Sequence, residues 1–189
     1  QFSGLKLVDL SLPAEFCQAF RGPAFGVAGT REVSGVSNGP LVGTIVKPSV
    51  GLTPQQTTAL VSQLCAAGID FIKDDEKLMS PIYSPLEDRV KAIMPMILDR
   101  EQKTGKKIMY AWGISATDPD EMMRNHDLVL KHGGNCAVIN INSIGIGAMA
   151  FLRKRSALVL HAHRNGWDIL TRHPGLGLDF KVWQQFWRL

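Results

Sequence analysis

Short apolar runs alternate along the chain with longer segments that mix apolar and polar positions. The runs that predict β-strands are residues 41–47, 69–73, 107–112, 137–141 and 157–161. They are almost continuously apolar, which is typical of parallel strands that are buried on both faces. The mixed segments between them predict helices. A chain in which strand and helix alternate in this way predicts an α/β fold.

Three of the predicted helices begin with the same order of residue types. An N-cap residue is followed by proline at the first helical position and by glutamine or glutamate at the third. The three segments are Thr53-Pro54-Gln55-Gln56, Ser84-Pro85-Leu86-Glu87 and Asp118-Pro119-Asp120-Glu121. They recur about every thirty residues, the length of one βα unit. Two further helices are expected to begin near Gly145 and Asp179.

A doubly wound sheet and a (β/α)₈ barrel both fit such a chain. The Gly-x-Gly-x-x-Gly pattern of a dinucleotide-binding fold does not follow the first predicted strand. Chemically capable side chains instead follow several different strands, as they do at the C-terminal face of a barrel. They are Lys47, Lys73, Asp75, Glu76, Asn140, His161, His163 and Arg164. We therefore expect a (β/α)₈ TIM barrel, with about five of its βα units in residues 41–189.

Both ends of the chain fall within apolar stretches. It begins at Gln1, before Phe2, and stops at Leu189 within an apolar helix face. Chain ends are usually more polar. We expect a fragment of a longer protein, in which residues 1–40 connect into the first strand of the barrel.

Composition and charge narrow the classes of partner. The net charge is only +4, and no aromatic residues interleave with the one dense basic cluster, Arg153-Lys154-Arg155, so we expect no nucleic-acid partner. No apolar run approaches the roughly 20 residues of a membrane span, so no membrane partner is expected. The cysteines, Cys17, Cys65 and Cys136, are odd in number and have no paired spacing. They predict buried thiols in a reducing cytoplasm.

The most informative polar segment is Lys73-Asp74-Asp75-Glu76, which directly follows an apolar strand. Alternation along the strand places Lys73 and Asp75 on one face and Asp74 on the other, with Glu76 at the turn. Two convergent carboxylates suit a hard cation, above all Mg²⁺. An ammonium would repel that cation, so Lys73 fits only if it pairs with the carboxylates or is converted to an anion. The alternative is a strand end followed by a solvated acidic turn.

Other strand ends carry further candidates. Lys47 precedes a proline, where a crowded apolar mouth could lower its pKa and make it a proton-transfer base. His161 and His163 share one strand face, and Arg164 beyond them could bind a phosphate or carboxylate. Asn140 could bind a sugar hydroxyl. Each has an ordinary alternative: an exposed lysine, histidines satisfied by the backbone, and an asparagine that caps a loop.

Three segments together resemble the ribulose-bisphosphate carboxylase (rubisco) large chains and the rubisco-like proteins. Residues 44–52 begin with a threonine and continue with a segment that resembles K-P-K-x-G-L at the first strand of that family. Residues 70–76 resemble D-F-x-K-D-D-E, and residues 161–164 resemble H-x-H-R at the fifth strand. Order and spacing match as well, over essentially the whole chain. The resemblance implies that residues 1–40 lead from a missing N-terminal α+β domain, and that residues 41–189 form the first five βα units of the barrel domain.

The resemblance also implies roles for the candidate residues. In this family the lysine at the position of Lys73 is carbamylated by CO₂ and binds Mg²⁺ together with the carboxylates that match Asp75 and Glu76. A carbamate would turn Lys73 from a cation into an anionic oxygen ligand, and the metal would stabilise an enediolate or enolate of the substrate. The remaining implied roles are proton transfer by Lys47, contact with a substrate hydroxyl by His163, and phosphate binding by Arg164. His161 and Asn140 are further candidates for substrate binding.

Two departures from the family pattern bear on the reaction. The second lysine of K-P-K is Ser49 here, and the histidine four residues past H-x-H is Trp167, which narrows the pocket and removes a polar contact. They favour a rubisco-like protein over a CO₂-fixing carboxylase. Residues 47–52, 163–167 and 170–174 look most like a branch that decarboxylates 3-oxo-isoapionate 4-phosphate. Loss of CO₂ from that β-keto acid also yields an enolate, so the resemblance implies a carboxy-lyase acting on a phosphorylated sugar acid.

Three alternatives stay open: ribulose-bisphosphate carboxylation, 2,3-diketo-5-methylthiopentyl-1-phosphate enolase activity, and a catalytically silent fragment or assembly domain. We expect the full-length protein to form a homodimer or a higher oligomer. The isolated chain is expected to be weakly active or inactive, because later strands and a neighbouring subunit complete the site in this family.

Overall fold

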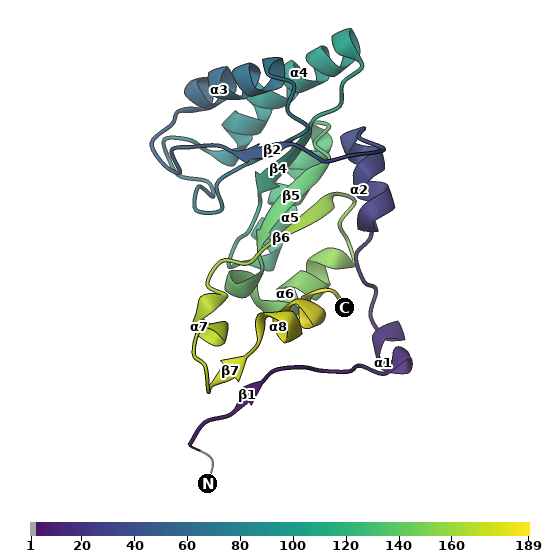
Figure 1. The fold of residues 1–189 in the computed structure, drawn as a ribbon. Helices are drawn as coiled ribbons and strands as arrows, with labels where there is room; N and C mark the ends of the chain where they lie inside the picture. The colour runs from purple at the N-terminus through teal and green to yellow at the C-terminus, as the bar shows by residue number, and fades with distance from the viewer. Residues whose placement is uncertain (1–2) are drawn as a thin grey trace.

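Five parallel strands form the central sheet of the computed structural model, which describes residues 3–189. The strands follow one another in space in the order of the sequence (Figure 1). They are β2 (Gly43–Ile45), β3 (Phe71–Lys73), β4 (Met109–Gly113), β5 (Cys136–Asn140) and β6 (Val159–His163). All five predicted strands are confirmed. The last extends two residues beyond its predicted end and includes His163.

Four helices connect these strands and pack against one face of the sheet (Figure 1). They are α3 (Pro54–Ala66), α4 (Leu86–Thr104), α5 (Pro119–Lys131) and α6 (Ile141–Arg153). Ile72, Tyr110 and Ile139 line that face and are almost completely buried against α4 residues such as Ile93. The predicted alternation of strand and helix is therefore confirmed.

The opposite face of the sheet carries a smaller apolar cluster. Ala111, Cys136 and Val138 are buried there, with Phe25 and Val33 packed against them. Phe25 immediately precedes α2 (Gly26–Ser34) and Val33 lies within it, so α2 covers the part of this face that carries the cluster. The functional side chains described below lie above this cluster, at the C-terminal ends of the strands.

The remaining elements lie at the two ends of the chain. β1 (Lys6–Leu7) pairs in parallel with β7 (Gly177–Leu178), so segments near the two chain ends lie side by side (Figure 1). The short helices are α1 (Ala14–Gln18), α7 (Asp168–Thr171) and α8 (Phe180–Trp187). Within residues 3–189 the structure contains no helix of the length and apolar character needed to cross a membrane.

Two of the three predicted N-caps are confirmed. The Thr53 hydroxyl accepts from the Gln56 N–H in a complete capping box, and the Asp118 carboxylate accepts from the Asp120 N–H. The prediction for Ser84 is wrong, because α4 begins one residue later than expected. The Ser80 hydroxyl accepts from the Leu86 N–H instead, at 3.0 Å, while the Ser84 carbonyl accepts from a buried arginine.

The helices expected to begin near Gly145 and Asp179 differ in how closely they match the prediction. The Asp179 carboxylate caps α8 by accepting from the Lys181 N–H, as its position suggested. The helix expected near Gly145 begins earlier, at Ile141. Gly145 has φ 79° and interrupts that helix with a kink, since glycine adopts this backbone conformation at little steric cost.

The three cysteines differ in exposure. Cys65 and Cys136 are buried as expected, whereas Cys17 on α1 is exposed, so the prediction of a buried thiol is wrong there. All five residues of helix α1 are exposed. Burial raises the pKa of Cys65, and it raises the pKa of Cys136 to about 12.

We expect iodoacetamide at pH 8 to alkylate Cys17 alone in the folded chain. A thiolate is the reactive species, and Cys136 with a pKa of about 12 forms almost none at that pH. Mass spectrometry of tryptic peptides measures the labelling, with the Cys17→Ser variant as the control that removes it. Labelling of Cys136 without denaturant would contradict the packing of β5.

Candidate functional site

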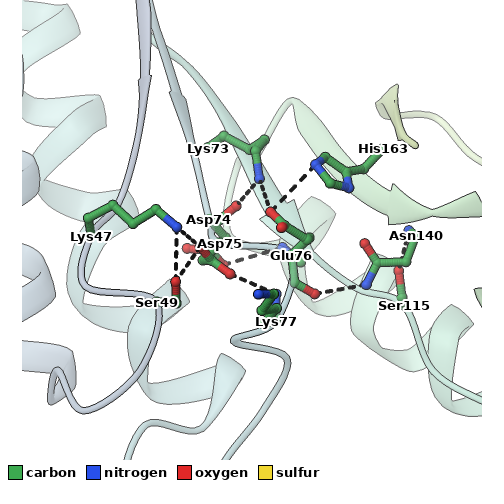
Figure 2. Close-up of polar contacts among 11 residues, drawn as sticks. Lys47, Ser49, Lys73, Asp74, Asp75, Glu76, Lys77, Ser115, Asn140 and His163 are labelled. Atoms are coloured by element: carbon green, nitrogen blue, oxygen red, sulfur yellow. Dashed lines mark hydrogen bonds and ion pairs between the residues drawn. The ribbon is translucent and has the colours of Figure 1, made fainter. Parts of the chain in front are cut away.

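The candidate side chains converge because their strands are in register. Lys73 pairs with Ile45 of β2, two residues before Lys47, while Asn140 of β5 pairs with His163 of β6. Paired residues lie on the same face of a parallel sheet, and residues two apart on a strand share that face. Lys47, Lys73, Asn140 and His163 therefore project from the face opposite helices α3–α6, at its C-terminal edge (Figure 2).

Asp75 is the best-satisfied carboxylate of the site. Its Oδ2 accepts from Lys47 Nζ at 2.6 Å and from the Ser49 hydroxyl at 2.8 Å, and its Oδ1 accepts from the Lys77 N–H at 2.9 Å. Burial opposes the ionisation of Asp75, but these hydrogen bonds outweigh it and lower the pKa. Asp75 is thus held as an anion, and its position is fixed from both sides.

Glu76 occupies the other half of the site, between Lys73 and His163 (Figure 2). Lys73 Nζ donates to Glu76 Oε2 at 3.0 Å and to the Asp74 carbonyl at 2.7 Å. His163 Nε2 lies 3.6 Å from the same Glu76 oxygen. Burial opposes the ionisation of Glu76, but its own backbone N–H and the Lys73 ammonium lower the pKa. Burial lowers the pKa of His163, against the attraction of Glu76.

Asn140 fixes the backbone of the acidic turn. Its side-chain N–H donates to the Glu76 carbonyl at 2.8 Å, and its backbone N–H donates to the Ser115 hydroxyl at 2.8 Å. The Asn140 Oδ1 is buried, and no donor among the described residues forms a hydrogen bond with it. The loop-capping alternative thus accounts for the amide N–H groups of Asn140 but not for its Oδ1.

The expectation of a lowered pKa for Lys47 is wrong. Its side chain is 57% exposed, and the hydrogen bond to Asp75 raises the pKa. The surroundings of a strand end depend on the loops above it. Here the Lys47–Ser49 segment is open to solvent, so there is no apolar mouth to destabilise the ammonium.

Asp74 points to the opposite face of the sheet, as the alternation predicted, and is completely buried there. Tyr110 donates to its Oδ1 at 2.6 Å, while Arg89 of α4 and the Gly113 N–H each donate to Oδ2 at 3.3 Å. Burial and the Asp74 carboxylate raise the pKa of Tyr110 well above its ordinary value, so Tyr110 remains a donor. These contacts hold the acidic turn against the helix layer.

Arg89 is a structural partner of the site that the strand-end pattern does not indicate. Its position on α4 could have identified it, because it lies three residues after Leu86 and four before Ile93, on the buried stripe, where a charge needs a buried partner. Arg89 also donates to the carbonyls of Met79 and Ser84. One guanidinium therefore joins the turn after β3, the following loop and α4.

Lys73, Asp75 and Glu76 form an acidic cluster, and two predicted substrate contacts lie outside it. His161 is deeper on β6, where its ring packs 5.5 Å from that of Phe71, and burial lowers its pKa to about 4. Arg164 lies beyond the end of β6 and lines a separate pocket of about 320 Å³ with His163 and Trp167. His163 therefore borders both the acidic cluster and the pocket, which makes it the link between them.

The acidic cluster supplies the donor types that a magnesium site with a modified lysine would need. Within residues 3–189 no three His, Cys, Asp or Glu side chains gather closely enough to hold a metal ion. Asp75 and Glu76 supply two carboxylates, and each is paired with an ammonium. A carbamate on Lys73 would replace one cation by a third oxygen ligand, the donor type that Mg²⁺ prefers. Such a carbamate would make Lys73 a ligand instead of a competing cation.

Comparisons with known proteins place the chain in a family. Residues 26–189 match the model of the ribulose bisphosphate carboxylase large chain, catalytic domain. A 3-oxo-isoapionate-4-phosphate decarboxylase of Rhizobium etli is 68% identical over 99% of the chain and 45% of its own length. The chain thus spans less than half the length of that relative.

Solved structures show the same architecture. A rubisco-like protein from Burkholderia fungorum matches 98% of the chain and 46% of its own length, with a TM-score of 0.95 and 44% identity. The octameric rubisco of Pyrococcus horikoshii matches 97% of the chain and 44% of its own length, with a TM-score of 0.92 and 31% identity. The chain belongs to the family of rubisco large-chain catalytic domains, and its five-stranded sheet is part of their TIM barrel.

Proposed function

We propose that the full-length protein is a magnesium-dependent decarboxylase of 3-oxo-isoapionate 4-phosphate. The proposal rests on the 68% identity with the Rhizobium etli decarboxylase, which extends over 99% of the chain. The matched length includes the whole acidic cluster and the Arg164 pocket. We also propose a homodimer or higher oligomer, since the similar rubisco of Pyrococcus horikoshii is octameric.

The proposed reaction needs an electron sink beside the carboxyl group. The C–C bond to the carboxyl group breaks, CO₂ leaves, and the electron pair passes into the neighbouring ketone as an enolate. A proton then adds to the carbon that carried the carboxyl group. Mg²⁺ held by carbamylated Lys73, Asp75 and Glu76 would supply positive charge next to the developing enolate oxygen.

The residues around the cluster supply the other steps of the proposal. Lys47 is protonated and exposed at the mouth of the site, so its ammonium can deliver the proton to carbon. His163, which borders both the acidic cluster and the Arg164 pocket, would contact a substrate hydroxyl. Arg164 would bind the phosphate in the neighbouring pocket. His161 and Asn140 remain further candidates for substrate contacts.

The proposal is tested by incubating the full-length protein with 3-oxo-isoapionate 4-phosphate and Mg²⁺. We expect release of one CO₂ per substrate, measured by a coupled carbonate assay, and loss of that release in EDTA. Ribulose bisphosphate with ¹⁴CO₂ is the comparison reaction, and no labelled phosphoglycerate is expected. Labelled phosphoglycerate without decarboxylation of the oxo acid would replace the proposal by the carboxylase alternative.

A further inference from the structure

Arg164 rests against two aromatic side chains at the rim of the site. Its guanidinium carbon lies 4.8 Å from the centre of the Trp167 ring and 6.0 Å from that of Phe180. The two rings contact each other, with their centres 4.8 Å apart and their planes tilted by 56°. Trp167 precedes α7 and Phe180 begins α8, so two separate segments form one aromatic surface under the guanidinium.

The two arginines of this pocket are held in different ways. Arg172 is neutralised by Asp168, with Nη2 and Oδ2 2.5 Å apart. Arg164 has no carboxylate partner among residues 3–189, although its pocket is lined by His163, Trp167 and Asp168. A guanidinium stacked on an aromatic face keeps its N–H groups free in the plane, where they can meet an anion.

The backbone below Arg164 is tied down independently of the stacking. The Asn165 carbonyl accepts from the Asn142 side chain at 2.5 Å, and the Asn165 side chain donates to the Ser143 hydroxyl at 2.8 Å. The start of α6 thus fixes the loop that follows β6. The long Arg164 side chain still has several free torsions, so the direction of its guanidinium depends on what lies beside it.

We propose that Trp167 is a positioning residue for Arg164, and that Phe180 supports it. Its indole face fixes the guanidinium at the pocket rim, with the N–H groups directed to the phosphate of the substrate. Trp167 replaces a histidine of the family pattern and thus exchanges a polar contact for a stacking surface. This inference rests on the phosphate-binding role of Arg164 in the proposed function, and it adds the residue that orients that group.

The test measures phosphate binding in the full-length protein without turnover, so a failed decarboxylation assay does not affect it. Inorganic phosphate is titrated into ¹⁵N-labelled protein while the Arg164 Nε–H signal is followed by NMR, with Arg164→Lys to assign it. We expect Trp167→Leu to weaken phosphate binding about 3- to 30-fold, as expected for loss of a cation–π contact. The ring-current shift of the Nε–H signal should disappear with it.

Two matched variants separate stacking from other effects. Trp167→Phe keeps an aromatic face and should restore most of the affinity. Phe151→Leu removes another cation–π pair, with Arg155 3.9 Å from the Phe151 ring centre at the C-terminal end of α6, and should leave phosphate binding unchanged.

A double-mutant cycle decides between positioning and a purely structural role. Trp167→Leu should have no further effect on phosphate binding in an Arg164→Ala background, because the group that it orients is absent. A loss of equal size in both backgrounds would overturn the proposal, and so would unchanged phosphate affinity in Trp167→Leu itself. Circular dichroism confirms that each variant is folded before titration.

Discussion

Replacing Asp74 by alanine is expected to lower the free energy of unfolding by about 3–5 kcal/mol, because the change leaves the Arg89 guanidinium buried without its counter-ion. Both side chains are completely inaccessible to solvent. Tyr110 loses its acceptor in the same variant, and its hydroxyl is buried as well. Urea denaturation of the full-length protein, followed by circular dichroism, measures the effect.

An exposed ion pair on α4, the helix that carries Arg89, provides the matched control. Glu87 and Lys91 are four residues apart on α4, and each side chain is more than half exposed. Glu87→Ala should therefore cost no more than about 0.5 kcal/mol. If Asp74→Ala proved as mild as Glu87→Ala, the buried network would not be what holds the acidic turn.

The double variant Asp74→Asn, Arg89→Met distinguishes two contributions to the free energy of unfolding: the destabilisation by an unpaired buried charge, and the net stabilisation by the ion pair. Removing both charges avoids a buried ion without a partner, so the double variant should be more stable than Asp74→Ala. Met79 and Ser84 lose a donor to their carbonyls, and their loop should become more accessible to proteolysis. Stability equal to that of Asp74→Ala would show that the loop contacts, and not the charge, dominate.

Strand ends were the most predictable part of this molecule. Nearly continuous apolar runs indicated buried parallel strands, and the polar residues that end them had to meet at one edge of the sheet. The structure brings Lys47, Lys73, Asn140 and His163 to that edge, and the family assignment made from three motifs is confirmed. Strand alternation also assigned Asp74 to the face opposite Lys73 and Asp75, where the structure buries it.

Features that depend on distant segments could not be predicted in this way. The exposure of Lys47 is set by the loops above the sheet. Its hydrogen bond to Asp75, a residue 28 positions away, raises its pKa, which is opposite to the expected direction. Ser84 has the sequence of an N-cap, yet its carbonyl is bound by Arg89 and Ser80 caps the helix. Local preference for a cap is weak enough for one tertiary contact to override it.

The separation between the acidic cluster and Arg164 was not predictable either. The sequence places His161, His163 and Arg164 within four residues, but the structure distributes them along the strand and beyond it. His161 packs on Phe71, His163 faces Glu76, and Arg164 stacks on Trp167. A strand advances about 3.3 Å per residue, so residues that are neighbours in the motif lie at different positions along the sheet. This spacing suits the proposed substrate, in which the reacting carbon and the phosphate are at opposite ends.

Lys73→Ala is expected to abolish metal-dependent turnover of the full-length protein, a loss of about 10³-fold or more. The variant removes the nitrogen on which CO₂ would form the carbamate, and leaves Asp75 and Glu76 as the only oxygen donors of the proposed metal site. Lys73 is 8% exposed and donates to Glu76, so its side chain lies inside the cluster, next to one of the two carboxylates. Decarboxylation at saturating Mg²⁺ measures the loss.

Lys77 is the matched control for this variant, since it lies on the same turn and is exposed. Its backbone N–H, which donates to Asp75, survives the change to alanine. Lys77→Ala should keep turnover within about twofold, as expected for an exposed side chain away from the cluster. Wild type and Lys77→Ala should both show a carbamate signal by ¹³C NMR in labelled bicarbonate with Mg²⁺, and Lys73→Ala should lack it. Full turnover by Lys73→Ala would exclude the modified lysine as a required ligand. This would hold even if the variant lost the carbamate signal, because the carbamate of the wild type would then not be needed for turnover.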